Sequence, residues 1–505
     1  MKLLEIYLTP LGTDPKRFHA HPSQSFAGEG WADSDLPFWE GDQDWRSPII
    51  KVLEGSGVFK SEHFPNPGEQ EWLATAGILN PDRTHFEHGY LKRIGKLLYQ
   101  SLFPPDSSPR SLRSIFQGAV RLAENENTEL HLRLKFSADS AARSRLADYP
   151  WELLHDGQHF LQERNVRISR YIAYESLPPN LPSQERVRVL LVSARPHDPA
   201  GKLATLSSEE AVAIQAGLTK AEAEGNIVLE SLSQATFDAL RVDLTERTSA
   251  QMPQVLHFDG HGVFGKRCAN PNCGRVHPGI KADRCRDCGQ ALPEDPVGFL
   301  IFEDKEGKPE YVSARSFAAA LPKETALVVL SACQSGMAIA GRSLFNGTAQ
   351  QLIDRRTPVV VAMQYAVRAD AASRFAEQFY RVLGQKKPVL EAVNQGQQWM
   401  GFDGNQWYRP VVYLRWLDNQ GGELFLSAES VTPTRTRFSR FQRLEIERLE
   451  VDLRDLEQDY ESVKKQLRVE LDASTINRLE RRIEQIGKDM DLKEQQLSQL
   501  KQQDE

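Results

Sequence analysis

Two stretches decide the fold of this chain: QVLHFDGHG at residues 254–262 and ALVVLSACQSG at residues 326–336. Each begins with a short apolar run, at 254–258 and at 326–331, of the kind found in strands that are buried on both faces. Each run is followed by glycine and by one reactive side chain, His261 in the first stretch and Cys333 in the second. Open α/β sheets hold their ligands beyond the carboxyl ends of their strands, so the two stretches predict a site shared by two strand ends.

The surroundings of these stretches alternate apolar runs with helical patterns. Further strands are expected at 187–193, 227–232, 298–303 and 358–363, and helices at 207–224, 236–247, 313–321, 344–356, 369–383 and 389–400. A helix at 90–103 and an alternating strand at 130–136 precede them. Strands that alternate with helices predict the α/β class, with a mainly parallel sheet covered by helices on both faces.

The chemistry of His261 and Cys333 is that of a thiol and its base. A cysteine needs a neighbouring imidazole or cation to ionise near neutral pH. Gly260 and Gly262 leave the backbone around His261 free to adopt unusual torsions and to approach a substrate. His257 is the competing histidine, and the apolar alternation of its strand favours a structural role for it.

The distance between the two residues along the chain gives an independent check. They are 72 positions apart, and 47 when the 25-residue insertion at 266–290 is left out. Caspases carry their histidine roughly 50 residues before the cysteine. The trimmed spacing therefore agrees with a cysteine–histidine dyad.

The insertion at 266–290 contains the remaining four cysteines. Cys268 and Cys273 are separated by four residues and Cys285 and Cys288 by two, and a glycine follows each pair. This spacing is typical of a zinc ribbon, in which four thiolates close the coordination sphere of a structural Zn²⁺. So short a loop cannot bury a hydrophobic core, and metal binding would fold it. His277 is the spare ligand if one cysteine is not used.

The insertion follows His261 closely and is expected beside the mouth of the site, where it would guide a substrate or a partner. Its cations could also contact nucleic acid, but a solvated face is the preferred interpretation. These cations are Lys266, Arg267, Arg275, Lys281, Arg284 and Arg286.

Composition narrows the class of protein further. The chain has 505 residues, a net charge of −7, and 40% hydrophobic and 26% charged residues, which suits several buried cores. The acidic charge argues against nucleic acid as the main partner. No apolar run approaches the ~20 residues of a membrane span, and the first residues lack a secretory signal. We therefore expect a cytoplasmic protein without membrane contact.

The two ends of the chain differ from its centre. Residues 1–87 are rich in proline, glycine and tryptophan with poor periodicity, and they are interpreted as an N-terminal module of unknown function. Near the C-terminus, apolar residues follow a 4-3 spacing from 449 to 467 and again from 476 to 500. Two such seams joined by a short link predict an antiparallel coiled-coil hairpin over 436–505.

The ordered motifs of the central region resemble the CHAT domain family of caspase-like cysteine peptidases, which is related to separases. The resemblance is carried by HFDGHG and LSACQSG together with YPWELLHDG (149–157), NGTAQQLIDRRTPVVVAMQYAV (346–367), FAEQFYRVL (375–383), PVLEAV (388–393) and WYRPVVYL (407–414). It implies a caspase–haemoglobinase fold over 88–425, with a smaller first half at 88–185 and a catalytic half at 186–425. It also implies that Cys333 is the nucleophile, that His261 is the catalytic histidine, and that the N–H groups of Gly262 and Cys333 form the oxyanion hole.

The substrate pocket is less defined by this resemblance. Caspases carry glutamine two positions before the cysteine and metacaspases carry aspartate, whereas this chain has Ser331. Asp259, two positions before His261, could place a negative charge in a pocket for the residue before the cleaved bond. Turn capping is the preferred interpretation of this aspartate. Asp259 and Ser331 are the candidate substrate-binding residues.

The function expected from these observations is that of a cysteine endopeptidase which cleaves protein substrates. The resemblance implies an effector in a bacterial defence or cell-death pathway, activated by a protein partner through the C-terminal hairpin or the N-terminal module. The alternative is a catalytically idle scaffold or adaptor that acts through the hairpin and the zinc ribbon. A zinc-ribbon sensor of nucleic acid is the third hypothesis, and the acidic charge opposes it.

Overall fold

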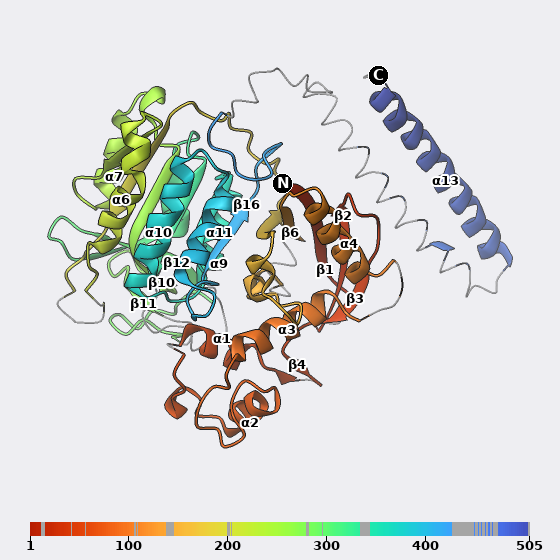
Figure 1. Cartoon of the computed structure of the whole chain (residues 1–505), viewed down its shortest axis with the longest axis horizontal. Coiled ribbons are helices and arrows are strands. Elements are labelled where there is room, and N and C mark those ends of the chain that lie inside the picture. The colour runs from red at the N-terminus through yellow and green to blue at the C-terminus, as the bar shows by residue number, and fades with distance from the viewer. Residues whose placement is uncertain are drawn as a thin grey trace. The chain divides into compact units, whose positions relative to one another are not determined.

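The computed structural model of the chain describes residues 1–11, 16–41, 43–55, 57–105, 108, 110–137, 146–198, 203, 205–278, 282–294, 296–333, 344–426, selected positions between 449 and 467, and 473–502. The chain divides into two compact units, Met1–Leu426 and Ser427–Glu505. The first unit contains the sheet and its covering helices (Figure 1).

The half of the first unit at 186–425 is built on parallel strands in the order β9-β8-β10-β14-β15. These strands are β8 (Val187–Ser193), β9 (Ile227–Ser231), β10 (Val255–Arg267), β14 (Leu327–Cys333) and β15 (Val359–Met363). Antiparallel strands extend the sheet on either side, namely β12 (Val297–Glu303), β13 (Pro309–Ser313) and β16 (Pro410–Leu414). The predicted mainly parallel sheet is confirmed.

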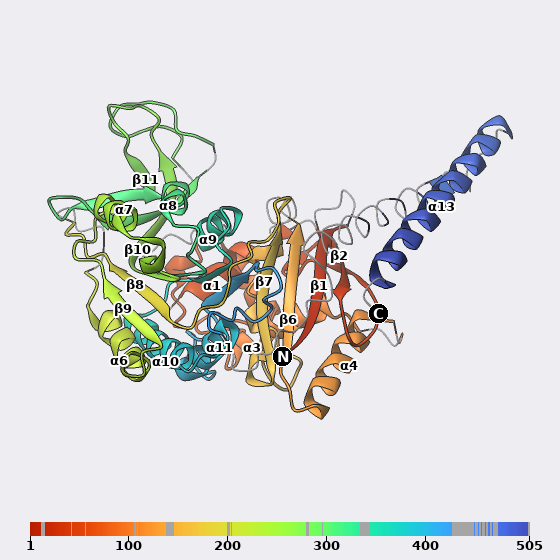
Figure 2. The same cartoon turned by 90° about the horizontal axis from the view of Figure 1, so that it is seen from above.

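Helices cover both faces of this sheet, as predicted. One layer contains α6 (Glu209–Ala223), α10 (Ala369–Gly384) and α11 (Val389–Met400). The other contains α7 (Phe237–Glu246), α8 (Ala314–Ala320) and α9 (Leu344–Asp354). Figure 2 shows the two layers on opposite sides of the strands. The strands between the two layers carry apolar residues on both faces, because each face packs against one layer of helices.

The same sheet continues into the first part of the chain. β1 (Lys2–Pro10) pairs in parallel with β6 (Leu130–Ser137), which pairs in parallel with β7 (Val166–Ala173). β2 (Arg17–Gln24) and β3 (Ala32–Asp35) complete this end, and α3 (Tyr90–Leu102) and α4 (Leu112–Asn125) belong to the same half. Residues 1–87 are therefore not a separate module, because β1 lies between β6 and β2 in the main sheet. The strand signal was present in the alternating Leu4, Ile6 and Leu8, all of which are buried.

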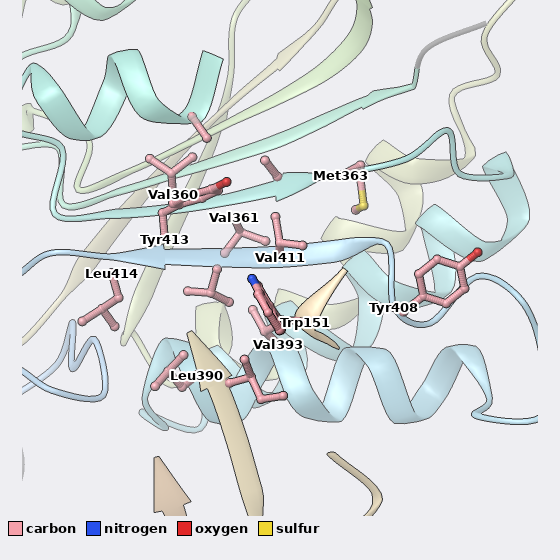
Figure 3. Packing of buried hydrophobic residues seen from close by; sticks show 14 of the residues in the cluster. Trp151, Val360, Val361, Met363, Leu390, Val393, Tyr408, Val411, Tyr413 and Leu414 are labelled. Carbon is pink, nitrogen blue, oxygen red and sulfur yellow. The ribbon is translucent and has the colours of Figure 1, made fainter. Parts of the chain in front are cut away.

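The two halves of the sheet meet where β16 pairs with β7. Trp151 is fully buried there and donates its indole N–H to the carbonyl of Leu146 at 2.8 Å. Figure 3 shows its ring between the strand that carries Val411 and the helix that carries Val393. Nearby, the buried Arg170 is ion-paired with the buried Glu152. This junction keeps the halves in a fixed relation.

The second unit contains the long helix α13 (Ala473–Gln502). Val463, Leu479 and Ile486 form a buried cluster with partly buried residues of the same two seams, Leu456, Tyr460, Leu467, Ile483 and Met490. The side chains of the two predicted seams therefore pack against each other. No helix within the described part of the chain is long and apolar enough to cross a membrane.

Candidate functional site

The two sequence motifs meet in the sheet through the pairing of β10 with β14. The register pairs Val255 with Leu327 and continues without interruption to His261 opposite Cys333. Cys333 is the last residue of β14 and is described by its backbone. Residues 334–343, which include the last three positions of the second motif, lie outside the described residues. The strand register thus brings the candidate base and the candidate nucleophile to the same level of neighbouring strands.

The strand end expected before His261 is absent. β10 runs on from Val255 to Arg267, and neither Gly260 nor Gly262 has a positive φ. Gly260 is required for space: a Cβ built there would lie 2.8 Å from the ring of Phe258 and 3.3 Å from the Cβ of Ala194. The glycine therefore permits close packing around an extended strand, and the expectation of unusual torsions was wrong.

The continued strand holds the cysteine-rich insertion next to β14. His261 pairs with Cys333 on one edge of β10 and with Ile301 of β12 on the other. Further along, Gly265 pairs with Val297 of β12 and with Pro278 of β11 (Val276–Pro278). Since β12 occupies one edge at both levels, β11 must share the other edge with β14. The insertion thus lies four positions beyond His261, on the edge of β10 that carries Cys333.

His257 is structural, as its position in the strand suggested. The buried imidazole makes hydrogen bonds with the hydroxyl of Tyr380 on α10 at 2.9 Å and with a carboxylate oxygen of Glu210 on α6 at 3.2 Å. These hydrogen bonds join α6 and α10 to β10 four residues before His261.

Asp259 lies within β10 and caps no turn. Its carboxylate is ion-paired with Arg195, and the hydroxyl of Ser193 donates to it at 3.4 Å. Burial and the nearby Glu210 raise the pKa of Asp259, and Arg195 opposes them. The turn-capping interpretation was wrong because the strand continues through this residue. The charge that could have served a substrate pocket is neutralised by Arg195.

Ser331 pairs with Asp259 in the register and is buried. Its hydroxyl has no hydrogen-bond partner among the described residues. Gly262 is half-buried and directly follows His261, and Cys333 ends the neighbouring strand, so the two N–H groups predicted for an oxyanion hole lie at adjacent positions of the sheet.

The four cysteines of the insertion converge on one point. Their sulfur atoms all lie within 4.8 Å of one another, with 3.5 Å between Cys268 and Cys288 and 3.6 Å between Cys273 and Cys285. Four thiolates bound to one Zn²⁺ at ~2.3 Å lie about 3.8 Å apart in a tetrahedron. The four thiols are therefore close enough to bind a metal ion.

Hydrogen bonds support the same arrangement. N–H groups of Cys288 and Asp287, with the imidazole of His277, lower the pKa of the Cys285 thiol to about 6. The Nε2 atom of His277 lies 3.2 Å from the sulfur of Cys285. The predicted spare ligand is thus placed as a hydrogen-bond partner of a ligand. Such partners orient the ligands of metal sites.

Arg195 is the residue of the site that sequence analysis missed. It follows β8, whose carboxyl end lies at the same edge of the sheet as those of β10 and β14. The expectation that functional residues follow the carboxyl ends of parallel strands, which pointed to His261 and Cys333, could therefore also have indicated Arg195. Its pairing with Asp259 depends on strand order, which the motifs do not reveal.

Residues 92–411 match the CHAT domain, so the chain belongs to the CHAT domain family. Residues 439–500 match effector-associated domain 9. A comparison with curated proteins finds no match.

Similar solved structures include the Arg-specific cysteine proteinase gingipain R, with 12% identity and a TM-score of 0.35 over 63% of this chain and 69% of that one. The separase of Saccharomyces cerevisiae in complex with securin has 11% identity and a TM-score of 0.37. That match covers 81% of this chain and 30% of the separase chain.

Proposed function

We propose that this CHAT-domain protein is a caspase-like cysteine endopeptidase whose dyad is Cys333 and His261. The observation that carries the proposal is the register of the parallel strands β10 and β14, which pairs His261 with Cys333, the last residue of β14. Family membership supports the same chemistry, because CHAT domains resemble caspase-like peptidases. The substrate is a protein.

In the proposed reaction, the sulfur of Cys333 attacks the carbonyl carbon of a peptide bond. The N–H groups of Gly262 and Cys333 stabilise the oxyanion of the tetrahedral intermediate. His261 transfers the thiol proton to the leaving nitrogen as the carbon–nitrogen bond breaks, which leaves a thioester on Cys333. Water then hydrolyses the thioester to a carboxylate and regenerates the thiol.

The four-cysteine site is proposed to hold one structural Zn²⁺. Four thiolates leave no open position for a substrate or an activated water, so the metal would stabilise the insertion and take no part in bond cleavage. One zinc per chain in protein purified without chelator is expected, and Cys288→Ser should lower this content. A metal content well below one per chain would contradict the proposal.

The second unit is proposed to receive the activating partner. Its match to an effector-associated domain supports this role, as does the expected action of such proteins in bacterial defence or cell death. A chain that lacks the second unit and still cleaves its substrate at the rate of the full-length chain would argue against it.

The test of the enzyme uses a cysteine-reactive peptide probe and a cellular proteome, with wild type, Cys333→Ala and His261→Ala. Wild type should be labelled at Cys333 and should produce cleavage fragments that both variants lack. The matched control is His159→Ala, which removes an exposed histidine outside the proposed site. Equal labelling and cleavage in wild type and Cys333→Ala would reject the dyad and favour the alternative of an idle scaffold.

A further inference from the structure

A groove of about 740 Å³ lies between the cysteine-rich insertion and the edge strand β13. Its walls include Arg267 at the end of β10, Val276 of β11, Tyr311 of β13, and Arg275 and Arg286 of the insertion. This volume is within the range of about 300–1,000 Å³ that is usual for sites that bind compact ligands. The catalytic proposal makes no use of this groove.

The groove opens on the face of the sheet to which His261 belongs. Residues two apart in a strand share a face, and so do residues paired between neighbouring strands. Arg267 is six positions beyond His261 on β10, and Tyr311 pairs with Ile301, which pairs with His261. The site and the groove therefore lie on one surface of the sheet.

An apolar cluster connects the two places on this face. Val263, Val276, Phe299 and Ile301 are buried together, and Tyr311 packs against them. Val263 is the next residue after His261 on the same face of β10, and Val276 lines the groove. The groove and His261 therefore lie at the two ends of one apolar cluster on the same face of the sheet.

The charges of the groove favour an anionic segment. Arg275 is neutralised by Asp287 at 2.5 Å. Arg267 donates to the carbonyl of Tyr311 and lies 5.1 Å above the ring of Phe299, which hold its guanidinium in place. Glu310 also lines the groove and acts on Arg267 through space, but neither Arg267 nor Arg286 makes a close ion pair with a carboxylate that the structure describes. Three arginines therefore face two carboxylates, Asp287 and Glu310, and the lining keeps an excess of positive charge.

We propose that this groove is an exosite that binds an acidic segment of the protein substrate through Arg267 and Arg286. The inference rests on the proposed peptidase function. It adds a preference for substrates that carry an acidic segment away from the cleaved bond. The segment is extended and carries carboxylates, because fixed guanidinium groups bind carboxylates with defined geometry.

The test measures binding without cleavage, on the full-length Cys333→Ala protein. Fluorescence anisotropy compares a labelled ten-residue peptide of alternating glutamate and glycine with the same peptide carrying glutamine. The glutamate peptide should bind at least about fivefold more tightly, with an affinity that falls as salt is added. The double substitution Arg267→Gln and Arg286→Gln should remove most of this difference.

Arg284→Gln is the matched control, because Arg284 lies in the same insertion, donates to the carbonyl of Gly289 and does not line the groove. Zinc content is measured for every variant, so that loss of folding is separated from loss of charge. Equal binding of the two peptides, or an equal loss in the Arg284→Gln protein, would overturn the exosite.

Two further outcomes separate this inference from others. Tighter binding of a ten-nucleotide single-stranded RNA than of the glutamate peptide would assign the groove to nucleic acid and refute the proposal. Peptide binding by a protein whose Cys333 shows no selective labelling would refute the role in substrate selection, whereas labelling without peptide binding would leave the dyad intact and remove the exosite.

Discussion

Substituting Gly260 by alanine tests how closely β10 is packed beside the candidate base. The new Cβ would lie 2.8 Å from two ring atoms of Phe258, about 0.6 Å inside an ordinary contact near 3.4 Å. The ring cannot turn away freely, because Phe258 is fully buried and its centroid lies 5.0 Å from that of Phe302. Overpacking of this kind costs about 1–3 kcal/mol.

The chain also gains from losing a glycine, by roughly 0.5–1 kcal/mol in a strand. Subtracting the gain from the cost leaves a net loss of stability for Gly260→Ala that is centred on about 1 kcal/mol. Phe258→Leu alone should cost about 1–2 kcal/mol because it removes buried ring atoms. In the double variant the smaller side chain makes room for the new methyl group, so the losses should fall short of additivity by about 1 kcal/mol.

Urea denaturation followed by tryptophan fluorescence measures the free energy of unfolding of wild type, the two single variants and the double variant. The peptidase rate should follow the same pattern, because His261 is the next residue on the strand. Additive losses, or a Gly260→Ala protein as stable as wild type, would show that the close contact with Phe258 is not the reason for glycine at this position.

Three further predictions concern the framework. Burial raises the pKa of Glu5, but the neighbouring cations Arg133 and Lys135 outweigh burial, so the pKa is lowered overall. The stability advantage of wild type over Glu5→Gln should therefore be full above pH 4.5 and vanish as the pH falls through the lowered pKa. A pH-independent difference in urea midpoint would contradict this. Glu152→Ala leaves the buried Arg170 unpaired and should cost about 3–5 kcal/mol, against a smaller loss for Glu152→Gln; equal midpoints for both variants would count against a buried ion pair. Gly217→Ala places a Cβ 2.4 Å from a backbone oxygen of α10 and should destabilise by more than 1 kcal/mol, whereas Gly118→Ala, whose nearest atom lies 4.0 Å away, should stabilise by about 1 kcal/mol; thermal midpoints that shift in the same direction would refute this reasoning.

The local pattern of the chain was enough to predict most of the strands and helices at 186–425. The strand expected at 187–193 is β8, and the helix expected at 389–400 is α11, with the same bounds. Apolar runs and helical periodicity are properties of neighbouring residues, so they survive without knowledge of the fold. The clustering of four cysteine sulfurs was predictable for the same reason, because the spacing of metal ligands is local.

The course of β10 was not predictable in this way. Glycines on both sides of His261 indicated a strand end with unusual torsions, yet pairing with β12 and β11 keeps the strand extended as far as Arg267. The place of β1 in the main sheet was missed because its partner β6 lies more than 120 residues away in the sequence. Pairing partners decide such cases, and neither the glycine pattern nor the composition names them.

By itself the sequence determined the class of the sheet, the nature of the candidate dyad and the four thiols, since each depends on residue type and short spacing. Only the tertiary structure decided that His261 is paired with Cys333, that Asp259 is neutralised by Arg195, and that the insertion shares an edge of β10 with β14. The physical reason is that strand order and register arise from contacts between distant segments, whose free energy is realised only when the whole core is packed.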